Sequence, residues 1–443
     1  MDPLIIALIV AVFTLITLFS GIPIAFGLSF VSVVLLVSFE GFQMLDVFAE
    51  TFYAGLNSFV LLSIPMFILM GMAVANSPAG KDLYTGLDRW LWRLPGGLVI
   101  SNIGACSIFA ALSGSSPATC AAIGTMGIPE MRKRGYSDQI ATGTIAAGGT
   151  LGVLIPPSIV LIVYGMATGT SIGRLFLCGL IPGFMLAGLF AIWALIHSYF
   201  IDKDSAKALR NKKPPTLKEK LEVLPRVLPF LFIIAGVLYV LYGGVATPSE
   251  ASGVGAFLVF VLIAVVYKIY QPKKIWNIIK VSMKESVMIM FIIAASYFFS
   301  FTLSQLYVTQ SLAQSMIELS ANKWVIFFLI NIFLLVAGFF LPPVAVIVMT
   351  SAILLPVITT LGFDPYWFAI VFTINMEIGL ITPPVGLNLY IIKGITPDVS
   401  LSEILKGSIP FMVMMALAIV ILCIFPEIVT WLPDKLMGKP LGY

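Results

Sequence analysis

The first residues that could bind a ligand are small and polar, and they lie inside otherwise apolar segments. Three serines, Ser113, Ser115 and Ser116, precede a second polar stretch that contains Gly149 and Thr150. Hydroxyl and carbonyl oxygens without formal charge suit an alkali cation, which needs several weak oxygen ligands. The pattern predicts a cation site, although small residues also allow helices to pack closely in membranes.

A second group has the same character and adds a carboxylate. Its members are Gly338, Phe340, Glu377, Gly379 and Thr382. An acidic side chain at membrane depth is costly, and it usually faces a polar cavity or a partner. We therefore predict a second cation site around Glu377, with a hydrogen bond to the opposing backbone as the simpler alternative.

An anionic solute would need positive potential, which helix N-termini can supply through free N–H groups and the helix dipole. Prolines predict such N-termini near Pro117, Pro157, Pro343 and Pro384. The remaining polar candidates for contact with the solute are Ser158, Asn375 and Asn388. Either asparagine could instead form a hydrogen bond between helices.

Two interrupted helices must position these groups. The apolar segments 139–167 and 366–392 each contain a proline pair, Pro156-Pro157 and Pro383-Pro384, at an offset of 227 residues. Proline removes a backbone donor, and freed backbone groups in a membrane are tolerated only inside protein or around a cavity. Helices broken at membrane depth, in corresponding parts of a chain, are typical of transporter binding sites.

The offset extends through the chain and indicates a duplication. Each half contains two short apolar arms around a polar or proline-rich centre, which predicts re-entrant hairpins at 97–131 and 324–361. Amphipathic arm helices are expected at 44–56 and 273–284. The predicted organisation is a first repeat (1–200), a basic loop (201–226) and a second repeat (227–443).

Composition places the whole chain in a membrane. Of 443 residues, 60% are hydrophobic and 10% are charged, which leaves no soluble alternative. We predict an all-α integral membrane protein with inverted repeats of about five transmembrane helices each. The formal net charge of +4 is small, and the positions of the basic residues indicate membrane topology rather than nucleic-acid binding. No phosphate loop, nucleophile motif or metal-ligand spacing suggests an enzyme.

The distribution of charge predicts the orientation. Of the 25 Lys and Arg residues, 21 fall in the segments 77–97, 130–137, 201–226, 268–284 and 393–407. The positive-inside rule assigns these segments to the cytoplasm. Five crossings per half then invert the second repeat and place both termini outside.

Several motifs resemble those of the large membrane (M) subunit of tripartite ATP-independent periplasmic (TRAP) transporters, and together they extend over nearly all of the chain. They are Ile64–Phe67, Gly104–Pro117, Gly149–Pro157, Thr247–Ala251 and Ile381–Gly386. The resemblance implies sodium-driven import of an organic acid, commonly a C4-dicarboxylate or a sialic acid, across the bacterial inner membrane. It also implies an elevator mechanism, a periplasmic substrate-binding protein and a small four-helix membrane (Q) subunit, here expected as a separate polypeptide.

Two alternatives remain open from the sequence. A stand-alone sodium/anion symporter of the divalent-anion type would have similar hairpins and no partner. An ion-translocating subunit of a respiratory complex would need several ionisable residues at membrane depth, and only Glu377 stands out.

Overall fold

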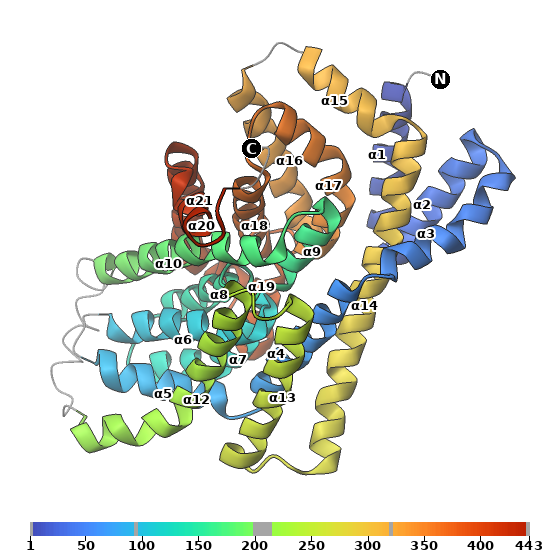
Figure 1. Ribbon diagram of the computed structural model, residues 1–443. Coiled ribbons are helices and arrows are strands. Elements are labelled where there is room, and N and C mark those ends of the chain that lie inside the picture. The colour runs from blue at the N-terminus through green and yellow to red at the C-terminus, as the bar shows by residue number, and fades with distance from the viewer. Residues whose placement is uncertain (1–2, 93–95, 198–214, 319–321, 440–443) are drawn as a thin grey trace.

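The computed structural model describes residues 3–92, 96–197, 215–318 and 322–439 (Figure 1). Within these ranges every regular element is a helix, and none is a strand. Seven of the described helices are long and apolar enough to cross a membrane, or up to nine elements if each bent pair is one span. The predicted all-α integral membrane fold is therefore confirmed.

The chain begins with two apolar helices and a bent arm. The elements are α1 (Pro3–Phe19), α2 (Ile24–Phe39), η1 (Phe42–Leu45), α3 (Asp46–Leu56), η2 (Phe59–Leu62), α4 (Ser63–Ala75) and α5 (Ala79–Leu91). The arm predicted at 44–56 corresponds to the end of η1 and α3. It meets the following η2–α4 segment at an angle of 59°.

A hairpin and a broken helix follow. They consist of α6 (Gly97–Ser113), α7 (Ser116–Lys133), α8 (Asp138–Leu154) and α9 (Ile159–Thr168), and α10 (Ile172–Ile196) comes next. Gly114, at φ +59°, reverses the chain between α6 and α7 in a conformation that glycine adopts without a steric penalty. The proline pair separates α8 from α9, which are bent by 41°.

The second half repeats this order. Its elements are α12 (Leu217–Tyr242), α13 (Pro248–Tyr267), α14 (Pro272–Gln305), α15 (Val308–Glu318), α16 (Lys323–Phe340), α17 (Pro343–Thr360), α18 (Pro365–Leu380), α19 (Leu387–Ile395), α20 (Leu401–Ile424) and α21 (Glu427–Met437). The second hairpin is α16 and α17, and the second broken helix is α18 and α19.

The structure corrects two boundaries. The predicted loop 201–226 ends at Thr216, because Thr216 and Glu219 form a capping box that starts α12 ten residues earlier than expected. Residues 201–214 of that loop lie outside the described residues. The predicted arm 273–284 is not separate either, since it is the first part of the continuous 34-residue helix α14. The second half has no break at this point, whereas α3 and α4 are separated.

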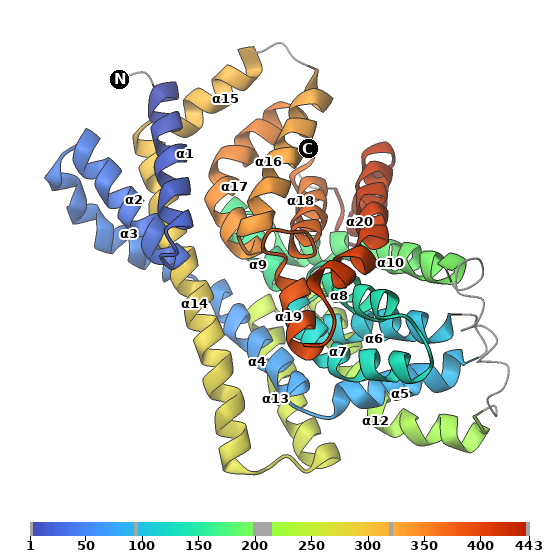
Figure 2. The ribbon, with the colours of Figure 1, turned by 180° about the vertical axis from the view of Figure 1, so that it is seen from behind.

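The hairpins and broken helices pack around one another. In each half the hairpin lies against its own broken helix, α6 and α7 on α8 and α16 on α18. The second half of each broken helix contacts the hairpin of the other repeat, since α9 packs on α17 and α19 packs on α7. Figure 2 shows α14 running beside this group, with α1, α2 and α3 at its far end.

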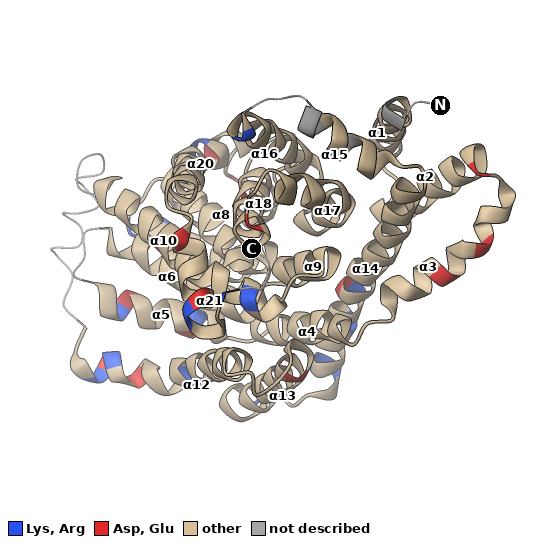
Figure 3. Ribbon diagram, turned by 45° about the horizontal axis from the view of Figure 1, so that its top comes forward, with Lys and Arg blue, Asp and Glu red and all other residues tan. Residues whose placement is uncertain are grey.

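Ion pairs join the segments that the charge pattern assigned to one side. Arg134 pairs with Asp88 at 2.7 Å, which connects 130–137 with 77–97. Asp82 accepts from Tyr267 at 2.8 Å and lies 3.6 Å from Arg226. Figure 3 shows charged residues on α5, α12 and α21, whereas the central helices are largely uncharged. The fold thus places the basic segments 77–97, 130–137 and 201–226 in contact through Asp82, Asp88, Arg134 and Arg226.

Candidate functional site between two hairpins and two broken helices

The two predicted cation groups meet at a single hydrogen bond. Ser116 Oγ, at the start of α7, donates to Glu377 Oε2 on α18 at 2.6 Å. Both side chains are buried, at 0% and 1% exposure. The second carboxyl oxygen, Oε1, is buried and accepts no hydrogen bond from any residue that the structure describes. The two groups, which the sequence suggested as separate sites, therefore adjoin across the repeats.

Glycines allow the hairpin tips to lie directly on the broken helices. A Cβ on Gly152 of α8 would lie 2.8 Å from the carbonyl carbon of Ser115. A Cβ on Gly379 of α18 would lie 2.6 Å from the carbonyl carbon of Gly338 in the second hairpin. Both obstacles are backbone atoms, which cannot rotate away as a side chain can. The first hairpin therefore contacts α8, the second hairpin contacts α18, and the hydrogen bond between Ser116 and Glu377 connects these two pairs.

The first hairpin tip also touches the break itself. A Cβ on Gly114 would lie 2.8 Å from the carbonyl oxygen of Pro157. The predicted ligand Gly149 faces the Cys120 sulfur, and a Cβ there would also lie 3.1 Å from the Ser116 carbonyl oxygen. Carbonyl oxygens of Ser116 and its neighbours thus lie beside the glycines of α8.

Most candidate hydroxyls already donate to the local backbone or to each other. Thr150 donates to the Ala147 carbonyl and Thr382 to the Ile378 carbonyl, each at 2.6 Å. Ser113 lies 2.9 Å from the Thr119 hydroxyl. Each hydroxyl oxygen keeps acceptor capacity after donating its proton. A cation here would be held by oxygens whose protons point away from it.

Helix N-termini at the site differ in capping. Ser158 accepts from Leu161 N at 3.3 Å and so caps α9. In the described chain, no side chain caps α7, α17 or α19. The predicted N-termini near Pro157 and Pro384 begin slightly later, at Ile159 and Leu387, because the residues after each proline pair are still extended or turned.

The two breaks also differ in exposure. The residues 155–158 of the first break are all buried, whereas Pro383, Pro384 and Val385 in the second are exposed. Phe340, at the tip of the second hairpin, is 39% exposed. The accessible part of the site therefore lies at the second break and the second hairpin.

The two candidate asparagines form contacts between helices. Asn375 Nδ2 donates at 2.9 Å to both the backbone and the side-chain oxygen of Asn331 on α16. Asn388 Nδ2 donates to the Ala146 carbonyl of α8 at 3.3 Å. Their Oδ1 atoms are buried and accept no hydrogen bond from described residues. Asn331 is not among the residues predicted from the sequence, although a single amide in an apolar helix is a signal that could identify it.

Outside the apolar segments, an arginine fixes the base of the first hairpin. Arg132 of α7 bonds to Asp138 of α8 at 2.6 Å and to Asp398 before α20 at 2.7 Å. The hydrogen bond from Arg132 lowers the pKa of Asp398 below its ordinary value. This contact also joins the first hairpin to the loop that follows the second broken helix, at the basic side of the molecule.

The oxygen atoms at this site are ligands that suit a hard, weakly coordinated cation. Within the described ranges, no group of three or more His, Cys, Asp or Glu side chains could hold a metal ion. The oxygens near Ser116 and Glu377 are carbonyls, hydroxyls and one carboxylate, a set that fits an alkali cation better than a transition metal.

Comparison with known proteins agrees with this architecture. Residues 9–428 match the family model described as "Tripartite ATP-independent periplasmic transporter, DctM component". The chain is 34% identical to a C4-dicarboxylate TRAP transporter large permease protein of Vibrio cholerae, over 95% of this chain and 96% of that protein. It is 30% identical to a sialic acid TRAP transporter large permease protein of the same organism, over 95% and 97%.

Two further comparisons concern length and fold. An isethionate TRAP transporter permease protein of Oleidesulfovibrio alaskensis is 32% identical, over 92% of this chain but 63% of that longer protein. The crystal structure of the YdaH transporter of Alcanivorax borkumensis shares the fold, with a TM-score of 0.64 over 91% of both chains at 13% identity. The chain belongs to the DctM family of large permease components of tripartite ATP-independent periplasmic transporters.

Proposed function

We propose that this permease imports an organic acid, a C4-dicarboxylate or a sialic acid, together with sodium ions. The names of the relatives support these substrate classes. The observation that carries the proposal is the buried contact between Ser116 and Glu377, where both hairpin tips and both broken helices adjoin. A carboxylate with one oxygen unused, surrounded by backbone carbonyls, is a reasonable binding site for a cation.

Sodium would be held by the same two groups of residues that the sequence indicates. In the first group the ligands would come from Ser113, Ser115, Ser116, Gly149 and Thr150. In the second they would come from Gly338, Phe340, Glu377, Gly379 and Thr382. Because Ser116 bonds to Glu377, a cation bound in one group would alter the electrostatic potential in the other.

The organic acid would bind at the exposed second break. The uncapped N-termini of α7, α17 and α19 would offer free N–H groups to its carboxylate. Bound cations would add positive potential nearby. The anion would then bind most tightly when sodium is present, and the membrane potential would contribute about 2.3 kcal/mol per net charge per 100 mV.

An elevator movement would carry the site across the membrane. The crossed packing of α9 on α17 and α19 on α7 joins the hairpins and broken helices of both repeats into one body. The long α14, with α1, α2 and α3, would form the surrounding frame. The second break would alternate between the two sides as this body moves.

The family name also supports two partners. A periplasmic binding protein would deliver the substrate, and a small membrane subunit would complete the permease. We place the chain in the bacterial inner membrane with the joined basic segments in the cytoplasm and both termini in the periplasm. A stand-alone symporter would have no need of the binding protein, and family membership disfavours a respiratory subunit.

Uptake into proteoliposomes tests the proposal. Vesicles would contain this chain and the small subunit, with the binding protein and a labelled C4-dicarboxylate or sialic acid outside. Uptake that requires both an inward sodium gradient and the binding protein is the expected result. Sodium-driven uptake without the binding protein would contradict this proposal and favour the stand-alone symporter. Uptake that does not depend on sodium would contradict the two proposed cation sites.

A further inference from the structure

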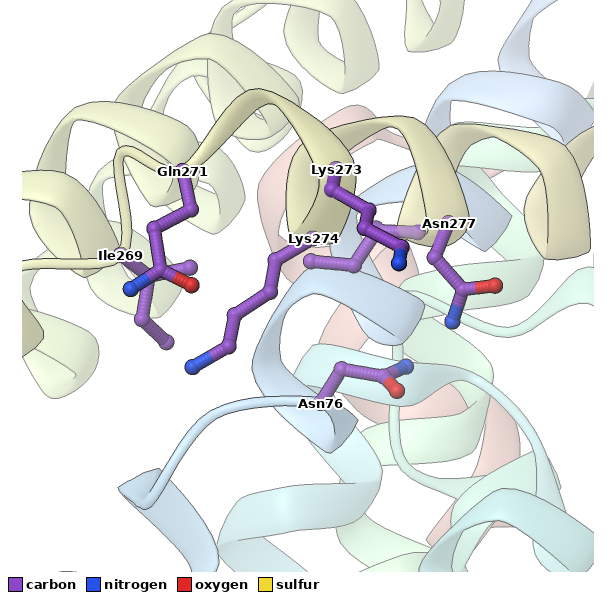
Figure 4. Close-up of a pocket in the computed structure, with 7 residues that line it drawn as sticks. Asn76, Ile269, Gln271, Lys273, Lys274 and Asn277 are labelled. Atoms are coloured by element: carbon purple, nitrogen blue, oxygen red, sulfur yellow. The ribbon is translucent and has the colours of Figure 1, made fainter.

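A lysine-lined cleft lies away from the transport site, at the junction of α13 and α14. It is an open cleft with a volume of about 440 Å³, and it is lined by Asn76, Ile269, Gln271, Lys273, Lys274, Asn277 and Ile278. Figure 4 shows Lys273, Lys274 and Asn277 extending from α14 to the side on which Asn76 ends α4. The floor is apolar, since Ile269 and Ile278 are 8% and 2% exposed.

The charges of the two lysines are not neutralised by any acidic residue that the structure describes. No salt bridge in the described chain involves Lys273 or Lys274, although other basic residues on the same side do pair with acids. Asp82, in the first turn of α5 after Asn76, already accepts from Tyr267 and lies 3.6 Å from Arg226. Asn76 Nδ2 already donates to the Met72 carbonyl at 2.9 Å and keeps one further N–H. Together with the two ammonium groups and the amides of Gln271 and Asn277, it gives the cleft hydrogen-bond donors suited to a phosphate group.

The first turn of α14 adds to this potential. Gln271 precedes Pro272 at the start of the helix, and no side chain in the described residues caps this N-terminus. The N–H groups of the first turn and the helix dipole favour a negative charge at this end. This contribution supplements the lysines, which supply the formal charge.

The surroundings of the cleft favour a lipid over a soluble anion. Exposed aromatic side chains flank the lysines, with Tyr270 at 68% and Trp276 at 65% exposure, as is typical of the membrane interface. Exposed apolar side chains continue along both helices, including Val265 at 72% on α13 and Met288 at 56% on α14. Acyl chains could follow these helices while a headgroup occupies the cleft.

We propose that this cleft binds the headgroup of an anionic phospholipid, with the phosphate between Lys273 and Lys274 and the amides of Asn76 and Asn277. The lipid would bridge the end of α4 and the start of α14 at the polar edge of the membrane. Basic pockets next to transmembrane helices bind anionic headgroups in this manner, with each lysine adding a modest electrostatic attraction.

Native mass spectrometry of the full chain in a neutral detergent tests this binding. Phosphatidylglycerol, phosphatidylcholine and glycerol 3-phosphate would be titrated separately. We expect saturable phosphatidylglycerol binding, with roughly tenfold weaker binding for the K273Q/K274Q variant. The matched K280Q/K284Q variant removes the same charge from α14 outside the cleft and should bind within about twofold of wild type. The K273R/K274R variant should also retain binding.

Three outcomes would overturn the proposal. Equal losses in K273Q/K274Q and K280Q/K284Q would show diffuse attraction to the helix rather than a site. Equal affinity for phosphatidylcholine would show that the acyl chains alone bind. Glycerol 3-phosphate binding as tightly as phosphatidylglycerol would assign the cleft to a soluble phosphate compound.

Discussion

Ser116 donates a 2.6 Å hydrogen bond to Glu377, a residue 261 positions later in the chain. The bond connects the tip of the first hairpin with the second broken helix, so it crosses from one repeat to the other. Because both side chains are buried, neither can exchange this partner for water without movement of the surrounding elements. This contact therefore couples the two halves of the proposed transport site directly.

Replacing either member of this pair should impair sodium-dependent uptake. Glu377→Gln removes the charge but keeps an acceptor, and Ser116→Ala removes the donor. Each should lower uptake about tenfold, since a hydrogen bond to a charged group contributes roughly 1.5–3 kcal/mol. The double variant should be no worse than about the stronger single one, because both changes disrupt the same contact. Normal sodium dependence in both single variants would contradict the assignment.

Adding a methyl group at the glycine contacts should also disrupt the site. Gly152→Ala and Gly379→Ala each place a Cβ against backbone, at 2.8 Å and 2.6 Å. We expect a loss of about 1–3 kcal/mol in stability together with reduced uptake. Gly188→Ala is the matched control, because a Cβ there meets nothing within 4 Å. Thermal unfolding in detergent measures the difference, and equal midpoints for all three variants would refute the close packing.

Asn375 should contribute to stability rather than to substrate affinity. Its two hydrogen bonds to Asn331 hold the second hairpin on the second broken helix. Asn375→Ala should therefore cost about 1–3 kcal/mol of stability, while the KM for the organic acid changes less than about twofold. A raised KM with unchanged thermal stability would instead support the substrate contact that the sequence suggested.

The ion pair of Asp88 and Arg134 should stabilise the basic side of the fold. Both Arg134 terminal nitrogens bond to Asp88 at 2.7 Å, and the side chains are only 21% and 16% exposed. Asp88→Asn should cost about 2 kcal/mol, because it leaves a mostly buried guanidinium with fewer partners. The double variant D88N/R134Q should lose less than the two single changes combined.

A matched control for that pair lies nearby on the same surface. Glu222 is 72% exposed and lies 3.8 Å from Arg89. Glu222→Gln should change the free energy of unfolding by less than about 0.5 kcal/mol, as is usual for exposed pairs. If Glu222→Gln and Asp88→Asn destabilised the protein equally, burial would not be the cause.

The membrane class, the hairpins and the broken helices could all be predicted from the sequence alone. Apolar runs, proline pairs and turn glycines act over a few residues, so they are visible without a fold. The 227-residue offset between the proline pairs showed how these elements correspond. The positions of Lys and Arg grouped the polar segments, and ion pairs such as Arg132 with Asp398 show that those segments meet.

The contacts between these elements could not be predicted from the sequence, because they depend on how distant segments pack. The Ser116–Glu377 bond, the crossing of α9 onto α17 and the pairing of Asn375 with Asn331 join residues that lie far apart in the chain. The sequence around each of these residues does not indicate its distant partner, because packing between helices depends on their shape and burial. The continuity of α14, where the first half has a break, was hidden for the same reason. An amphipathic stretch followed by an apolar one fits a single helix as well as two.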